Sequence, residues 1–173
     1  MADRSAMISE HKVARPDTVR FFLKQYGGVP QEFENDLVAQ LPGLLITQFN
    51  VPQPPRNGHH GSTGLRFDFT EDWFSIVAYL DQSKNPTGYY RVYLQSPLFY
   101  DGERWRGVLL VLNADVHPGW EYTILNEEDF IQAVEARWMP IYSAAKAREA
   151  LRDICKHLDE HCLPQEVMDA LSV

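Results

Sequence analysis

The chain has 173 residues, of which 45% are hydrophobic and 12% aromatic, and this is enough apolar material for one hydrophobic core. Its formal net charge of −8 at pH 7 argues against broad binding of nucleic acid or of anionic membranes, because both carry negative charge. No apolar run approaches the roughly 20 residues of a membrane-spanning helix, and the first residues lack the apolar region of a secretory signal. We therefore expect a single cytoplasmic domain.

Short runs of aromatic and β-branched residues, separated by turn-like residues, predict a meander of antiparallel strands. The predicted strands cover 19–26, 44–49, 65–69, 73–80, 89–94 and 105–116. The segment 31–41 has a mixed pattern that fits a helix or a strand. The stretch 50–64 is rich in proline and glycine, which predicts a long surface loop.

The apolar period changes from that of a strand to that of a helix after residue 125. The predicted helices cover 127–138, 143–162 and 165–171. Asn126 and Ser143 are the predicted N-caps of the first two, and Trp138 falls on the apolar stripe of the first. The fold class that follows is α+β, with an antiparallel β-barrel or curled sheet over about 19–125 and C-terminal helices over about 127–171 that cover one opening.

The sequence HPGW at 117–120 predicts a type II turn, because proline presets the second turn position and glycine tolerates positive φ at the third. Such a turn sets the register of a hairpin in which Asp115 pairs with Tyr122. Asn113, Asp115 and Asn126 then share one face of the sheet.

Four side chains with oxygen atoms are thereby expected to converge near this hairpin: Asn113, Asp115, Asn126 and Asp129. Mg²⁺ and Mn²⁺ take carboxylate, amide and water oxygens, so these four residues are the predicted metal ligands, and such a metal could hold phosphate. A second interpretation needs no metal. The helix dipole favours acidic residues in a first turn whatever the function, and Asn113 and Asp115 can simply face solvent.

Arginine and aromatic side chains alternate along the middle strands and suggest a surface for an anionic ligand. Arginine binds phosphate through its planar fork and aromatic rings stack on bases, so Arg91, Tyr93 and Arg106 are the predicted binding residues for a phosphate or nucleotide. The alternative is that these arginines are ordinary solvated side chains on the outside of a barrel.

The order of these features resembles the FomD-like family of small barrels, which includes metal-dependent nucleoside diphosphate and triphosphate phosphatases. The resemblance runs from about residue 65 to 154 and is carried by GYYRVYLQSP at 88–97, the long strand and turn that follow, and LNEEDF at 125–130. It implies a β-barrel, a divalent metal such as Mg²⁺ or Mn²⁺, and hydrolysis of nucleoside di- or triphosphates.

Departures from the family patterns, Y-x-N-L-x-x-P, D-x-D-L-D-V and L-D-E-D-E-F, indicate a weakened site. Tyr93 stands where asparagine is usual, Asn113 and Asn126 replace aspartates, and Asp129 replaces glutamate. Asp115 keeps its carboxylate if the turn is two residues shorter than usual; with the usual turn length no strand acid is kept. Metal binding is therefore expected to be weak and activity weakened or lost.

The alternative function is a non-catalytic barrel that binds a ligand, a protein or RNA. His59 and His60 in the loop are candidate acid or base groups, because histidine titrates near neutrality. Cys155 and Cys162 lie too far apart on a helix for a disulfide and are expected to be free thiols. A zinc site with the neighbouring histidines is not expected, because the thiols and the imidazoles lie on different sides of that helix.

Overall fold

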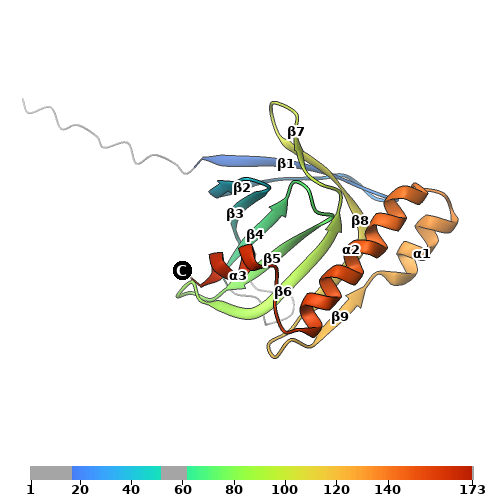
Figure 1. Cartoon of the computed structure of the whole chain (residues 1–173). Helices are drawn as coiled ribbons and strands as arrows, with labels where there is room; N and C mark the ends of the chain where they lie inside the picture. Colours follow the sequence, from blue (N-terminus) through green and yellow to red (C-terminus); the bar gives the residue numbers. More distant parts are fainter. Residues whose placement is uncertain (1–16, 52–61, 173) are drawn as a thin grey trace, which may run out of the picture.

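The computed structural model describes residues 17–51 and 62–172, so His59 and His60 lie outside the described residues. The strands are β1 (Thr18–Gln25), β2 (Gln31–Leu41), β3 (Leu44–Asn50), β4 (Thr63–Phe69), β5 (Phe74–Leu80), β6 (Pro86–Gln95), β7 (Phe99–Tyr100), β8 (Trp105–Val116) and β9 (Tyr122–Leu125). The helices are α1 (Glu127–Glu135), α2 (Ile141–Asp159) and α3 (Gln165–Leu171). Figure 1 shows α1 and α2 on one side of the molecule and α3 apart from them, near the C-terminus.

The sheet closes into a barrel, which confirms the predicted fold class. Strands β1 to β6 and β8 form the wall in the order β1-β2-β3-β4-β5-β6-β8, and a parallel pairing between β1 and β8 closes it. The other pairings are antiparallel, and β7 and β9 extend the sheet beside β8. The segment with the mixed pattern is strand β2.

The main apolar cluster lies between the outer face of the barrel wall and the helices. Ile76 and Ala78 of β5 belong to it, together with Ala147, Ile154 and Leu158 of α2. Figure 1 shows α2 running alongside β6 and β8, which it contacts. The expectation that the helices cover an opening is therefore wrong for α2. Its small alanines let the helix approach the wall closely, and burial of the stripe favours that position.

The predicted start of the second helix is wrong, and the predicted cap of the first helix lacks its hydrogen bond. Helix α2 begins at Ile141, directly after Pro140, and Ser143 lies inside it. The fixed φ of proline suits a helix start, and the Pro140 carbonyl accepts the N–H of Ala144 at 3.0 Å. Asn126 precedes α1 as predicted, but it adopts a left-handed conformation and its side chain makes no capping hydrogen bond.

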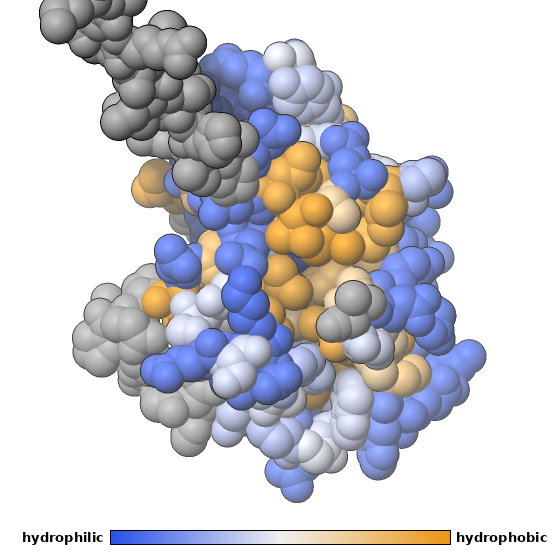
Figure 2. Space-filling view, turned by 90° about the vertical axis from the view of Figure 1, so that its left-hand side faces the viewer, coloured by the Kyte–Doolittle hydropathy of each residue, from blue (hydrophilic) through white to orange (hydrophobic). Residues whose placement is uncertain are grey.

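Figure 2 shows an apolar area among hydrophilic residues on the side of the molecule that carries β2 and α3. Val38 and Leu41 of β2 are about half exposed, at 53% and 51%. No helix in the described ranges combines the length and the apolar character that crossing a membrane requires.

Candidate functional site

The β8–β9 hairpin differs by one residue from the predicted register. Asp115 pairs with Thr123 and not with Tyr122. The 117–120 turn forms, and the N–H of its last residue donates to the carbonyl of its first at 3.0 Å. That last residue, Trp120, then adopts a φ of 71° and adds one residue to the loop. The extra residue moves every partner on β9 by one position.

A pocket of about 460 Å³ lies between the β1–β2 turn, β8 and α1. Its lining residues are Gln25, Tyr26, Gly27, Gln31, Tyr93, Leu109, Val111, Asn113, Asn126, Asp129, Gln132, Ala133 and Trp138. Four residues of the sequence prediction, Tyr93, Asn113, Asn126 and Asp129, are thus brought to one cavity. The volume lies within the usual range of small-molecule sites, roughly 300–1,000 Å³.

Local backbone irregularities bring these residues together despite the changed register. Tyr93 of β6 pairs with Asn113 of β8, so their side chains share the inner face of the barrel. Val111 bulges with a φ of 74°, and its carbonyl accepts a hydrogen bond from Asn126 Nδ2 at 3.2 Å. Asn126 has a φ of 65°, which turns the chain from β9 into α1. Asp129 lies in the first turn of that helix.

Asp115, the fourth predicted metal ligand, is held by Arg91. The two residues pair across β6 and β8, and the guanidinium donates to both carboxylate oxygens, from Nε at 2.5 Å and from Nη2 at 2.7 Å. This hydrogen bonding raises the pKa of Arg91. Since the fork already neutralises the carboxylate, Asp115 has little remaining charge to offer a cation.

The donor set at the pocket does not fit a catalytic divalent-ion site. The predicted ligands that line it, Asn113, Asn126 and Asp129, supply one carboxylate and two neutral amides. Across residues 17–51 and 62–172, no group of three or more His, Cys, Asp and Glu side chains is arranged to hold a metal ion. Hard divalent cations favour several charged oxygen ligands, so these residues would bind such a metal weakly.

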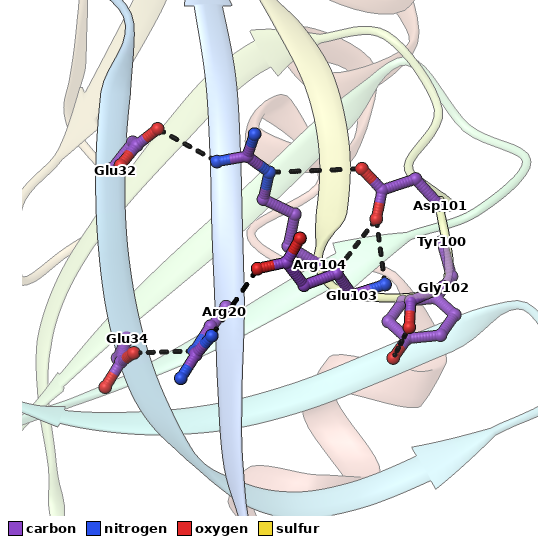
Figure 3. Close-up of polar contacts among 8 residues, drawn as sticks. All are labelled: Arg20, Glu32, Glu34, Tyr100, Asp101, Gly102, Glu103 and Arg104. Atoms are coloured by element: carbon purple, nitrogen blue, oxygen red, sulfur yellow. Dashed lines mark hydrogen bonds and ion pairs between the residues drawn. The ribbon is translucent and has the colours of Figure 1, made fainter.

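Arg106, the third predicted binding residue, lies outside this pocket. It forms an ion pair with Asp101, and its guanidinium lies 5.1 Å from the Phe22 ring. Hydrogen bonds from the Arg104 N–H, from Arg106 and from the Glu103 N–H hold the pKa of Asp101 well below its usual range. Figure 3 shows the surrounding network, in which acidic and basic side chains of β1, β2 and the β7–β8 loop alternate.

The structure contains a buried polar network inside the barrel that the sequence did not lead us to predict. Arg66 Nε lies 2.8 Å from Asp68 Oδ2, and its Nη2 donates to Ser75 at 3.1 Å and to Gln95 at 2.9 Å. The Arg66 guanidinium also lies 5.6 Å from the Tyr93 ring. The signal in the sequence is the alternation RFDF at 66–69, where charged and aromatic residues face opposite sides of one strand. This network anchors the inner face on which Tyr93 stands.

Trp138 lies at the pocket and not on the apolar stripe of a helix, where the sequence prediction placed it. Helix α1 ends at Glu135, so Trp138 leaves the apolar stripe, stays 54% exposed and lines the pocket. Its ring packs on Gly27, where an added Cβ would lie 3.3 Å from two ring carbons. Gly27 also has a φ of 70°, which favours glycine. This contact joins the β1–β2 turn to the segment after α1.

The cysteines are free thiols, as predicted. Cys162 Sγ lies 3.6 Å from His157 Nδ1, and burial raises the pKa of the Cys155 thiol.

Comparison with known proteins identifies the fold. No protein-family model and no curated protein matches the sequence. A solved structure of the phosphatase SC4828, with the non-hydrolysable nucleotide GPCP, aligns with a TM-score of 0.69 and 17% identity over 86% of this chain and 84% of that one. The chain has the fold of that protein. A complex of FomD with CDP aligns with a TM-score of 0.64 and 13% identity over 84% of this chain and 85% of that one.

A protein of unknown function, DUF402 from Rhodococcus sp. RHA1, aligns with a TM-score of 0.53 and 12% identity over 73% of each chain. The predicted resemblance to FomD-like proteins is confirmed for the fold. Two of these three structures were solved with a nucleotide or its analogue.

Proposed function

We propose that this protein binds a nucleotide in the pocket between the β1–β2 turn, β8 and α1, and that hydrolysis of di- or triphosphates is weak or lost. Nucleotide binding is supported by the fold, which is that of proteins crystallised with GPCP and CDP. It is also supported by the gathering of Tyr93, Asn113, Asn126 and Asp129 at one cavity. Tyr93 offers an aromatic ring to the ligand and the two amides offer hydrogen bonds.

The loss of hydrolysis is carried by one observation, the two-pronged ion pair between Arg91 and Asp115. A phosphatase of this kind needs a divalent ion to polarise the phosphoanhydride and activate water. Because Asp115 is paired with Arg91, the remaining predicted metal ligands are Asn113, Asn126 and Asp129. Only Asp129 carries a formal charge. Mg²⁺ or Mn²⁺ at this site is therefore expected to bind weakly. A cytoplasmic location stays a prediction.

Calorimetric titration and phosphate release test the proposal together. We expect nucleotides such as CDP and GDP to bind, Mn²⁺ alone to bind weakly, and phosphate release to stay at the rate without protein. Asn113→Ala is expected to weaken nucleotide binding by about two- to tenfold, the usual value of one hydrogen bond. Asn85→Ala, in an exposed turn away from the pocket, is the matched control and should change nothing. Tight Mn²⁺ binding with rapid turnover would contradict the loss of hydrolysis.

A further inference from the structure

We infer that the pocket recognises the uncharged nucleoside part of a nucleotide and not its phosphates, an inference that rests on the proposed nucleotide binding. Three properties of the lining carry it: its charge, its unused hydrogen-bonding groups and its aromatic rings.

The charge of the lining does not suit a phosphate chain. Among the described residues that line the pocket there is no lysine, arginine or histidine, and the one charged side chain is Asp129. Helix α1 adds Glu127, Glu128 and Glu135 and has no basic residue. Arg91 lies two positions from Tyr93 on β6, but its guanidinium already forms an ion pair with Asp115. A diphosphate in this pocket would meet the Asp129 carboxylate and no cationic side chain among the described lining residues.

The lining is rich in side-chain amides, which suit a neutral polar ligand. Five of them line the pocket: Gln25, Gln31, Asn113, Asn126 and Gln132. The amide of Asn126 donates to the Val111 carbonyl. The other four side chains make no hydrogen bond with any residue in the described ranges, so their donors and acceptors remain for a ligand. Each amide offers both kinds of group, and the edge of a nucleobase presents the same mixture.

Aromatic rings supply the apolar part of the recognition. Tyr26, Tyr93 and Trp138 line the pocket. Trp138 is fixed on one side by Gly27 and is still 54% exposed, so part of the indole surface is free for a planar ligand. Stacking on an aromatic side chain is a main source of affinity for bases and needs no charge. Amides and aromatic rings without cations thus match a nucleoside better than a polyphosphate.

Titration of paired ligands tests the inference. Adenosine, guanosine, cytidine and uridine are each compared with their diphosphates by calorimetry in EDTA and then with Mn²⁺. We expect at least one nucleoside to bind with a Kd within about threefold of its diphosphate, a difference of less than about 1 kcal/mol. Mn²⁺ should leave that ratio unchanged. A diphosphate that binds at least about tenfold more tightly than its nucleoside would overturn the inference but keep the proposed function. Binding by none of these compounds would overturn both.

Variants locate the binding. Trp138→Ala should weaken nucleoside and diphosphate alike by at least about fivefold, since stacking contributes about 1–3 kcal/mol per base. Ile131→Ala is the matched control, because Ile131 is also about half exposed, at 51%, and lies on α1 outside the lining. It should change neither affinity. If Trp138→Ala weakens the diphosphate but not the nucleoside, or neither, the inference is wrong.

Discussion

Replacing Arg91 by methionine is expected to lower the free energy of unfolding by about 1–3 kcal/mol, because the Asp115 carboxylate then lacks its partner. The two side chains are 30% and 27% exposed, and two hydrogen bonds of 2.5 and 2.7 Å join them. The pair therefore lies between exposed pairs, worth about 0.2–1 kcal/mol, and buried pairs, whose disruption costs about 3–5 kcal/mol. The same change should strengthen Mn²⁺ binding, since it releases a carboxylate.

Urea unfolding of a double-mutant cycle measures this interaction. The cycle combines Arg91→Met with Asp115→Asn, and we expect a coupling energy of about 1–2 kcal/mol, within the range usual for contacting residues. Arg20→Met is the control, because Arg20 pairs with Glu34 at 2.9 Å on the surface with 58% of its side chain exposed. The control should cost less than about 1 kcal/mol. Equal costs for Arg91→Met and Arg20→Met, or no coupling, would refute the reasoning.

Three further predictions concern charge and pH. The double change Asn113→Asp with Asn126→Asp should strengthen Mn²⁺ binding at least tenfold in calorimetry, because each new carboxylate at about 4 Å adds roughly 8 kcal/mol of gross attraction to a dication at an effective dielectric constant of about 20. Asp72→Asn should stabilise the protein at neutral pH by less than about 1 kcal/mol in urea unfolding, since burial and then Glu166 raise the pKa of Asp72 and disfavour its charged form in the fold. That gain should vanish at acidic pH, where the natural carboxyl is protonated. Burial raises the pKa of Tyr79 to about 12, so stability should fall between about pH 10 and 12, and Tyr79→Phe should reduce this fall in unfolding measured against pH.

The spacing of apolar residues predicts the strands and helices of this fold, because each element must bury one face and that face recurs at a fixed spacing along the sequence. Most of the strands, and the alanine-rich face of α2, follow from alternation and from helical spacing. Strands β3 to β6 and β8 bury apolar side chains in the same cluster as α2. Their arrangement does not follow in the same way. The packing of α2 on the outer wall depends on the closure of the barrel by β1 and β8, two strands far apart in the sequence.

The site could be predicted in part, because residue types indicate chemistry but not local backbone geometry. Asn113, Asn126 and Asp129 meet at one pocket as the pattern suggests. The register was wrong because Trp120 takes a positive φ, which residues other than glycine seldom adopt. Trp138 follows a helical spacing with Phe130, yet α1 ends three residues before it. Its place at the pocket could not be read from the sequence.

A crystal structure with a nucleoside diphosphate and Mn²⁺ tests the central claim most directly. The account predicts the nucleotide in the pocket lined by Tyr93, Asn113 and Trp138, the Arg91–Asp115 pair intact, and the diphosphate unhydrolysed. A nucleotide bound elsewhere would contradict it. So would a well-occupied Mn²⁺ ion held by Asp115 with Arg91 displaced.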